Sequence, residues 1–209
     1  GSVSQVRNCS SELQNLAKEN NIALLVIGHV TKDGALAGPK TLEHLVDVVL
    51  NFEGDNIASY RLLRSVKNRF GSTFEIGIFE MLENGLGEVS NPSSIFTNKE
   101  NTSGVTTTIT NEGSRPFAVD IQALVNKTFY NNPRRTTTGI NINRLHQILA
   151  VIEKHVGIKL SDYDCYIATG GGFEINDPTS DLGVAISVLS SLKNIPPLQN
   201  CSFIGELGL

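Results

Sequence analysis

The sequence predicts an α/β domain followed by an α+β domain, and three observations support this prediction. Before residue 90, segments with helical and strand-like patterns follow one another, beginning with a helix over Ser4–Asn20. Residues 90–102 are rich in Asn, Ser and Thr and have little apolar periodicity, which is typical of a linker. After the linker, strands come before helices instead of alternating with them. We therefore expect domains at 1–89 and 103–209, joined by the linker 90–102.

The first domain is organised around the short apolar run Ile22–Gly28. It is apolar on both faces and rich in branched side chains, as expected of a central strand in a mostly parallel sheet. A Gly- and Lys-containing loop follows from Thr31 to Lys40. The remaining predicted elements are a short helix over Thr41–Val48 and strands over Val48–Glu53, Tyr60–Val66 and Phe74–Met81.

The second domain begins with strands over Val105–Thr110 and Phe117–Val125. An amphipathic helix follows, and Gly157 is placed to end it. Its apolar stripe consists of Leu145, Ile148, Leu149, Ile152 and Val156. After a strand over Asp164–Thr169, three glycines at 170–172 predict a turn. A buried helix starts with Asp177 as N-cap, and Ser202–Leu207 is predicted as a last strand.

Composition excludes several classes of protein. A chain of 209 residues with 40% hydrophobic residues can bury a core and is not disordered. No apolar stretch is long enough to span a membrane, and the start does not resemble a signal peptide. Three scattered cysteines without a CxxC pair predict a reducing compartment. With a net charge of −4, any contact with DNA must come from local basic patches.

The stretch Lys67-Asn68-Arg69-Phe70-Gly71 is the most informative candidate site. Two cations leaving a strand at alternate positions point the same way and could bind a phosphate, while Phe70 could anchor the other face. The alternative is an ordinary strand end with solvated charges. His29, after the predicted central strand, could sense a nucleotide or be structural.

Further basic residues could contact a DNA backbone or be simply solvated. Lys32 and Lys40 bracket the flexible loop, and Arg134, Arg135 and Arg144 form a second basic cluster. Among hydroxyl groups, Thr179 or Ser180 could be a nucleophile, although capping of the helix explains them more simply.

The string Lys67–Gly71 matches the five-residue signature of the RadA/Sms family. Gly28-His29-Val30-Thr31-Lys32, Asn132-Pro133-Arg134-Arg135 and Gly205-Glu206-Leu207-Gly208-Leu209 also resemble that family, as do the first seven residues. The similarity covers essentially the whole chain apart from the linker. It implies that 1–89 is the C-terminal part of a RecA-like ATPase domain and that 103–209 resembles the Lon protease.

The resemblance also implies a function and a set of site residues. Family members form homo-hexameric rings that use ATP and Mg to drive branch migration of recombination intermediates on single-stranded DNA. The chain would then be a fragment, inactive alone, because the four-cysteine zinc motif and the Walker elements precede Gly1. Lys67, Arg69 and His29 are the implied catalytic residues. The expected DNA contacts are Arg7, Lys32, Lys40, Arg134, Arg135 and Arg144.

An alternative function is a Lon-type serine or threonine peptidase that uses Thr179 or Ser180. In the family resemblance, the activating Lys would lie beyond Leu209, and a nucleophile without its base is inert. The expected location is the cytoplasm of a bacterium, or an organelle if the source is eukaryotic.

Overall fold

A computed structural model of the chain describes residues 3–28, 38–54, 60–98 and 100–208. The chain forms an α/β fold with mixed sheets that divides into two compact units. The first unit consists of Gly1–Glu53 and Leu63–Glu75, and the second consists of Gly54–Leu62 and Ile76–Leu209. None of the helices among the described residues has both the length and the apolar composition that a membrane span requires.

The first unit contains two helices and the strand β1. The helix α1 covers Val3–Glu19, α2 covers Gly38–Leu45, and β1 covers Val48–Glu53. The amide of Gln14 on α1 donates to the carbonyl of Leu45 at the end of α2, at 2.6 Å. These elements confirm the predicted first helix and the predicted strand over Val48–Glu53.

The predicted central strand over Ile22–Gly28 is wrong. This segment has no regular secondary structure, and its apolar side chains are exposed, Ile27 among them. A strand forms only when its N–H and C=O groups pair with a neighbour. Within the described parts of the chain, no strand pairs with this segment. The run is apolar as expected of a buried strand. However, no strand among the described residues lies beside it to form a sheet.

A four-stranded sheet has the order β1-β2-β3-β4. The strands β2, β3 and β4 cover Tyr60–Asn68, Ile76–Leu82 and Gly85–Glu88. β3 and β4 are antiparallel, with Leu82 opposite Gly85. A two-residue connection can join only antiparallel neighbours, so the sheet that was predicted as mostly parallel contains a hairpin that sequence reasoning missed.

The second unit has a mixed sheet with the order β5-β6-β8-β7. β6 is antiparallel to both β5 and β8, whereas β7 and β8 are parallel. These strands cover Val105–Glu112 (β5), Arg115–Lys127 (β6), Arg135–Thr138 (β7) and Tyr163–Thr169 (β8). The parallel pair is possible because the helix α4, Ile142–Val156, provides the crossover between β7 and β8.

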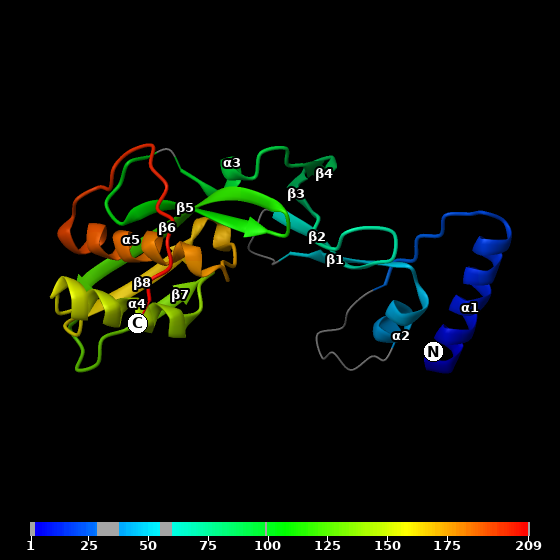
Figure 1. The fold of residues 1–209 in the computed structure, drawn as a ribbon, viewed down its shortest axis with the longest axis horizontal. Coiled ribbons are helices and arrows are strands. Elements are labelled where there is room, and N and C mark those ends of the chain that lie inside the picture. The colour runs from blue at the N-terminus through cyan, green and yellow to red at the C-terminus, as the bar shows by residue number, and fades with distance from the viewer. Residues whose placement is uncertain (1–2, 29–37, 55–59, 99, 209) are drawn as a thin grey trace. The chain divides into compact units, whose positions relative to one another are not determined.

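One face of this sheet is covered by α4 and by α5, Asp181–Lys193 (Figure 1). The core contains four of the five residues predicted for the stripe of α4, and only Val156 is exposed. Gly157 ends α4 in the left-handed region with φ of 73°, as predicted. The glycines 170–172 form a 3₁₀ turn, η1, in which Gly171 and Gly172 have positive φ.

The segment predicted as a linker takes part in a second core. The short helix α3, Ser93–Phe96, lies within residues 90–102, and Phe96 is buried there. Its ring packs against those of Tyr60, Phe117 and Phe173, with centroids 4.9–5.4 Å apart. Aromatic contacts of this kind stabilise a fold beyond the area they bury, which explains how α3 is held although the sequence around it is polar.

The predicted last strand over Ser202–Leu207 is also wrong. Its single bridge, within the described residues, joins Ser202 to Thr107. The backbone groups of this segment instead bond to several elements. The amide of Phe203 donates to Thr107, that of Gly205 to Thr179, and that of Leu207 to the Asp181 carboxylate. These three N–H groups therefore have hydrogen-bond acceptors on three different elements, and the segment needs no continuous pairing with one strand.

Candidate functional site

Lys67 lies near the end of β2 and contacts the C-terminal end of α2. Its ammonium group donates to the carbonyls of Glu43 and Val46, each at 2.8 Å. Carbonyls at a helix C-terminus lack partners within the helix, and a cation there is also favoured by the helix dipole. In this structure Lys67 therefore holds the end of α2.

The rest of the motif forms a turn that is tied to Asp47. The guanidinium of Arg69 pairs with the Asp47 carboxylate at 3.0 Å, and the backbone N–H of Arg69 donates to the Asp47 carbonyl at 3.1 Å. The Asn68 side chain accepts from the N–H of Phe70. Phe70 is 81% exposed, so the expectation that it anchors the other face is wrong. The turn presents Arg69 and Phe70 to solvent, while Lys67 contacts α2.

Three of the other predicted residues have no described side chain. His29 and Lys32 lie outside the described residues, and Lys40 belongs to α2 but its side chain is not described. Arg7 is exposed on α1. The structure therefore brings together Lys67 and Arg69, which both contact the segment between α2 and β1.

Two of the three cations of the predicted second cluster, Arg134 and Arg135, lie at the end of the loop 128–134, which connects β6 to β7. Arg134 is exposed, and its guanidinium lies over the ring of Tyr130, 3.9 Å from the centroid. Such a cation–π contact orients the charged group without neutralising it. The backbone N–H of Arg134 donates to the buried carboxylate of Asp164 at 2.7 Å. Arg134 is thus positioned, charged and accessible.

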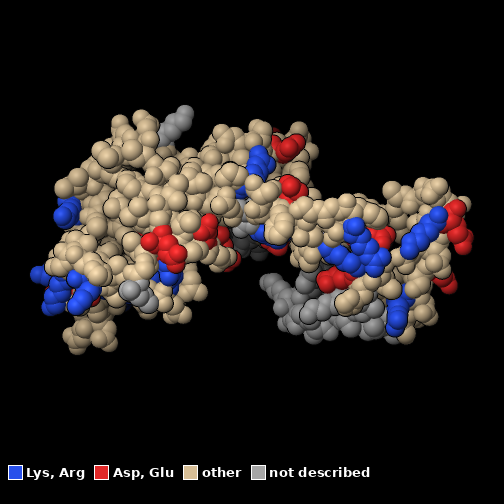
Figure 2. Space-filling view, viewed as in Figure 1, with Lys and Arg blue, Asp and Glu red and all other residues tan. Residues whose placement is uncertain are grey.

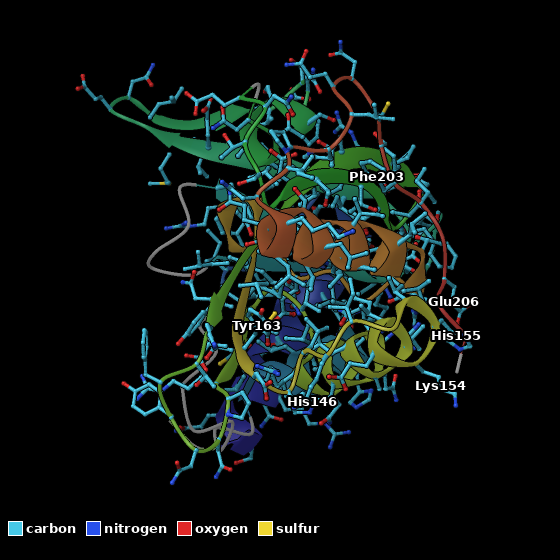
Figure 3. All side chains as sticks on the ribbon, turned by 90° about the vertical axis from the view of Figure 1, so that its left-hand side faces the viewer. His146, Lys154, His155, Tyr163, Phe203 and Glu206 are labelled. Carbon is cyan, nitrogen blue, oxygen red and sulfur yellow. The ribbon has the colours of Figure 1, made fainter. Side chains whose placement is uncertain are left out.

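The side chain of Arg135 is hydrogen-bonded to backbone carbonyls of the protein itself. Its guanidinium donates to the carbonyls of Arg134, Leu160 and Tyr163. Figure 3 labels Tyr163, which begins β8. These bonds hold the end of the loop against the turn that precedes β8. Arg135 also faces Cys165, whose pKa is raised to about 11 by burial, while the nearby positive charge of Arg135 opposes that rise.

The side chain of Arg144 also has a partner inside the protein, because it forms an ion pair with the buried carboxylate of Asp181. The Arg144 Nε donates to one Asp181 oxygen at 2.8 Å, and a terminal nitrogen donates to the other. The second oxygen also accepts from the N–H of Leu207 at 3.0 Å. Asp181 is 1% exposed and Arg144 is 30% exposed. The hydrogen bond with Asp181 raises the pKa of Arg144, and burial opposes this rise.

Glu206 lies 3.8 Å from the same guanidinium, and Figure 3 shows it near the end of the chain. This arrangement of Arg144, Asp181 and the backbone of Leu207 fastens the C-terminal segment to the start of α5. The predicted second cluster therefore separates into one available cation, Arg134, and two cations with internal partners, Arg135 and Arg144.

The candidate nucleophiles lie at a helix start. The Asp177 carboxylate accepts from the N–H of Thr179 at 3.0 Å, as an N-cap does. The buried hydroxyl of Ser180 donates to the Asp177 carbonyl at 2.9 Å. A nucleophilic serine needs a base that accepts its proton, and this hydroxyl donates to a backbone carbonyl instead. The cap is therefore the Asp177 carboxylate, whereas the Ser180 side chain makes no capping hydrogen bond at the start of α5.

The described residues contain no cluster of metal ligands, and the triple glycine is not a phosphate-binding loop. Among the described residues, no group of three or more His, Cys, Asp or Glu side chains could hold a metal ion. The triple glycine is followed by Phe173 rather than by the Lys-Ser or Lys-Thr pair of a phosphate-binding loop.

Sequence reasoning missed Phe129 and Tyr130, which are exposed beside Arg134. Two apolar residues at a strand end are more often part of a core, which explains the omission. A signal was nevertheless present in the sequence. No acidic residue occurs between Asp120 and Glu153, although the chain as a whole is acidic.

No family model matches the chain, but several curated proteins are similar to it over its full length. Over its full length, the chain is 54% identical to DNA repair protein RadA of Synechocystis sp. (strain ATCC 27184 / PCC 6803 / Kazusa) and covers 42% of that protein. It is 52% identical to DNA repair protein RadA of Listeria monocytogenes and 50% identical to that of Bacillus subtilis, covering 46% of each. The chain thus spans a little less than half the length of these curated relatives.

Proposed function

Because the chain belongs to the family of DNA repair proteins named RadA, we propose that it is the DNA-contacting part of a DNA repair protein. The single observation that carries this proposal is the identity of 50–54% over the whole chain. The relatives named above are bacterial, which favours the bacterial cytoplasm over an organelle.

The proposed protein is a homo-hexameric ring that uses ATP to drive branch migration of recombination intermediates on single-stranded DNA. In this proposal the first 89 residues complete a RecA-like ATPase domain, and residues 103–209 form a Lon-like domain that serves assembly and DNA contact. In this proposal ATP and Mg have their main site, and zinc its motif, in parts of the protein outside this chain.

Lys67 and Arg69 are proposed to act on ATP that is bound by a neighbouring subunit, with His29 as a nucleotide sensor. Arg69 supports this proposal because it is exposed and its partner, Asp47, is a surface carboxylate. A surface ion pair contributes little stability and can be exchanged for a phosphate. A cation delivered to a transferring phosphoryl group is worth roughly 10³–10⁵ in rate.

The proposed DNA contacts are the cations that the sequence singles out. Arg134 and Arg7 are exposed, which suits contacts with phosphate. Lys32 and Lys40 retain this proposed role. Arg135 and Arg144 would contribute less directly, through the loop and the C-terminal segment that they hold, since their guanidinium groups already have internal partners.

DNA-stimulated ATP hydrolysis by the full-length protein tests this function. We expect turnover to rise with single-stranded DNA and to fall with Lys67→Ala or Arg69→Ala. In mixed rings, a Lys67→Ala subunit should be rescued by a neighbour that keeps Lys67 and lacks ATP-binding capacity. Rings that are shown to be mixed and yet give no rescue would place the motif's action within its own subunit. Absence of any DNA-dependent activity would refute the proposed function.

A further inference from the structure

Phe129 is the most exposed large apolar side chain of the described residues, at 96%. It precedes Tyr130 in the first half of the loop 128–134, shortly after the end of β6, and Tyr130 is itself exposed. A single exposed apolar residue needs no explanation. Here, however, two aromatic residues and a cation lie together, and three further observations concern the same place.

The loop 128–134 is firmly built. At its start, the N–H of Thr128 donates to the Asp162 carbonyl at 2.9 Å, and the N–H of Tyr130 donates to the Thr128 hydroxyl at 3.1 Å. At its end, the Arg134 carbonyl accepts from Cys165 at 2.9 Å. Both ends of the loop are therefore hydrogen-bonded to β8 or to the turn before it.

The charge around the loop is positive. Lys127 and Arg134 are exposed on either side of the aromatic pair, and no acidic residue follows until Glu153. Of the two carboxylates at the start of β8, Asp164 is buried against the Arg134 N–H, and Asp162 pairs with Lys159 at 3.2 Å. Figure 2 shows Lys and Arg side chains at the lower left of the second unit, the end at which Figure 1 draws both this loop and one end of α4.

Part of the other face of the sheet β5-β6-β8-β7 is exposed near the loop. Residues that alternate with the core positions of β6, β8 and β7 point away from α4 and α5, and Leu124 among them is 55% exposed. Leu124 is opposite Tyr166, which in turn is opposite Thr136 on β7. The side chains of this row are uncharged and contain apolar surface. Because side chains alternate along a strand, Arg134 lies on the same side as Thr136.

We infer that the loop 128–134 and this sheet face bind single-stranded DNA, with Phe129 stacking on a base and Arg134 contacting a phosphate. The inference rests on the proposed function and deepens it by naming the contact. Single-stranded DNA fits because its unpaired bases offer their flat faces to aromatic side chains, while its backbone requires cations. The bases of a duplex are stacked on one another and offer no such faces at an ordinary contact surface.

Equilibrium binding of the full-length protein to labelled oligo-dT tests the inference. The variants are Phe129→Ala, Phe129→Trp and Arg134→Gln, with Leu198→Ala as the control for loss of another exposed apolar side chain of the second unit. Phe129→Ala should weaken binding roughly 5- to 150-fold, the effect that alanine substitution of a base-stacking residue produces. Phe129→Trp should retain binding, and Leu198→Ala should not change it.

The salt dependence and an abasic oligonucleotide separate stacking from charge. Phe129→Ala should leave the slope of log K against log[salt] unchanged, whereas Arg134→Gln should reduce its magnitude by about 0.7 for one lost phosphate contact. On an abasic strand of equal length, Phe129→Ala should have no effect. Melting temperatures of the variants should match that of the unsubstituted protein, because the replaced side chains are exposed.

Two results would overturn the inference while leaving the proposed function intact. One is oligo-dT binding by Phe129→Ala that equals binding by Leu198→Ala, which would assign the exposed Phe129 to another partner such as a protein. The other is an equal loss on oligo-dT and on the abasic strand, which would exclude base stacking. A full-length protein that binds no single-stranded DNA at all would overturn both the inference and the proposed function.

Discussion

Replacing Arg144 by Met removes the cation that compensates the buried carboxylate of Asp181. The methionine keeps much of the apolar stem but leaves a carboxylate that is 1% exposed with one remaining donor, the Leu207 N–H. Breaking a buried ion pair from one side costs about 3–5 kcal/mol. Because Arg144 is 30% exposed and water can partly replace it, we expect a loss of about 3 kcal/mol, at the lower end of that range.

Urea unfolding followed by circular dichroism measures this loss. With a slope of about 2 kcal/mol per molar urea, the midpoint should fall by roughly 1.5 M at unchanged slope. Arg144→Lys should lose less, because it keeps the charge without the two-pronged geometry. In the Asp181→Asn background, the further cost of Arg144→Met should shrink, since the two groups act as a pair. A midpoint shift below about 0.25 M, or full additivity of the two substitutions, would refute the ion-pair reasoning.

Other consequences can be measured separately. Arg135→Met should lower the free energy of unfolding by about 1–3 kcal/mol by removing the donor of three carbonyls, whereas Arg134→Met should change it by less than about 0.5 kcal/mol; equal losses would contradict the different roles of the two residues. At pH 8, iodoacetamide should label the two exposed cysteines of the folded protein and spare Cys165 until urea is added. Since folding raises the pKa of Cys165 from 9.0 to about 11, the stability it contributes is complete below pH 9 and is lost as pH rises towards 11. Lys67→Ala should weaken the attachment of α2, so hydrogen exchange in residues 42–45 should accelerate whether or not ATP turnover changes.

Elements with strong local signals were predicted well from the sequence. The stripe of α4 and the glycine at its end, the Asp177 cap and the triple-glycine turn all depend on residues a few positions apart. The exposure of Phe70 and the burial of Phe96 were not predicted, because both depend on packing partners that are distant in sequence. For the candidate site, the five-residue motif could be identified from its residues, but the contact of Lys67 with α2 could not.

The sequence by itself determined the family resemblance, the periodic helices and the list of cations that could contact DNA. Only the tertiary structure decided which of these cations are available. Arg135 and Arg144 find their partners 25 to 37 positions further along the chain, and no local pattern encodes a partner at that separation. The same holds for Ile22–Gly28, whose composition favours a strand while the ladder partners of a strand come from elsewhere in a fold. Local composition specifies what a residue can do, and long-range contacts specify whether it is free to do it.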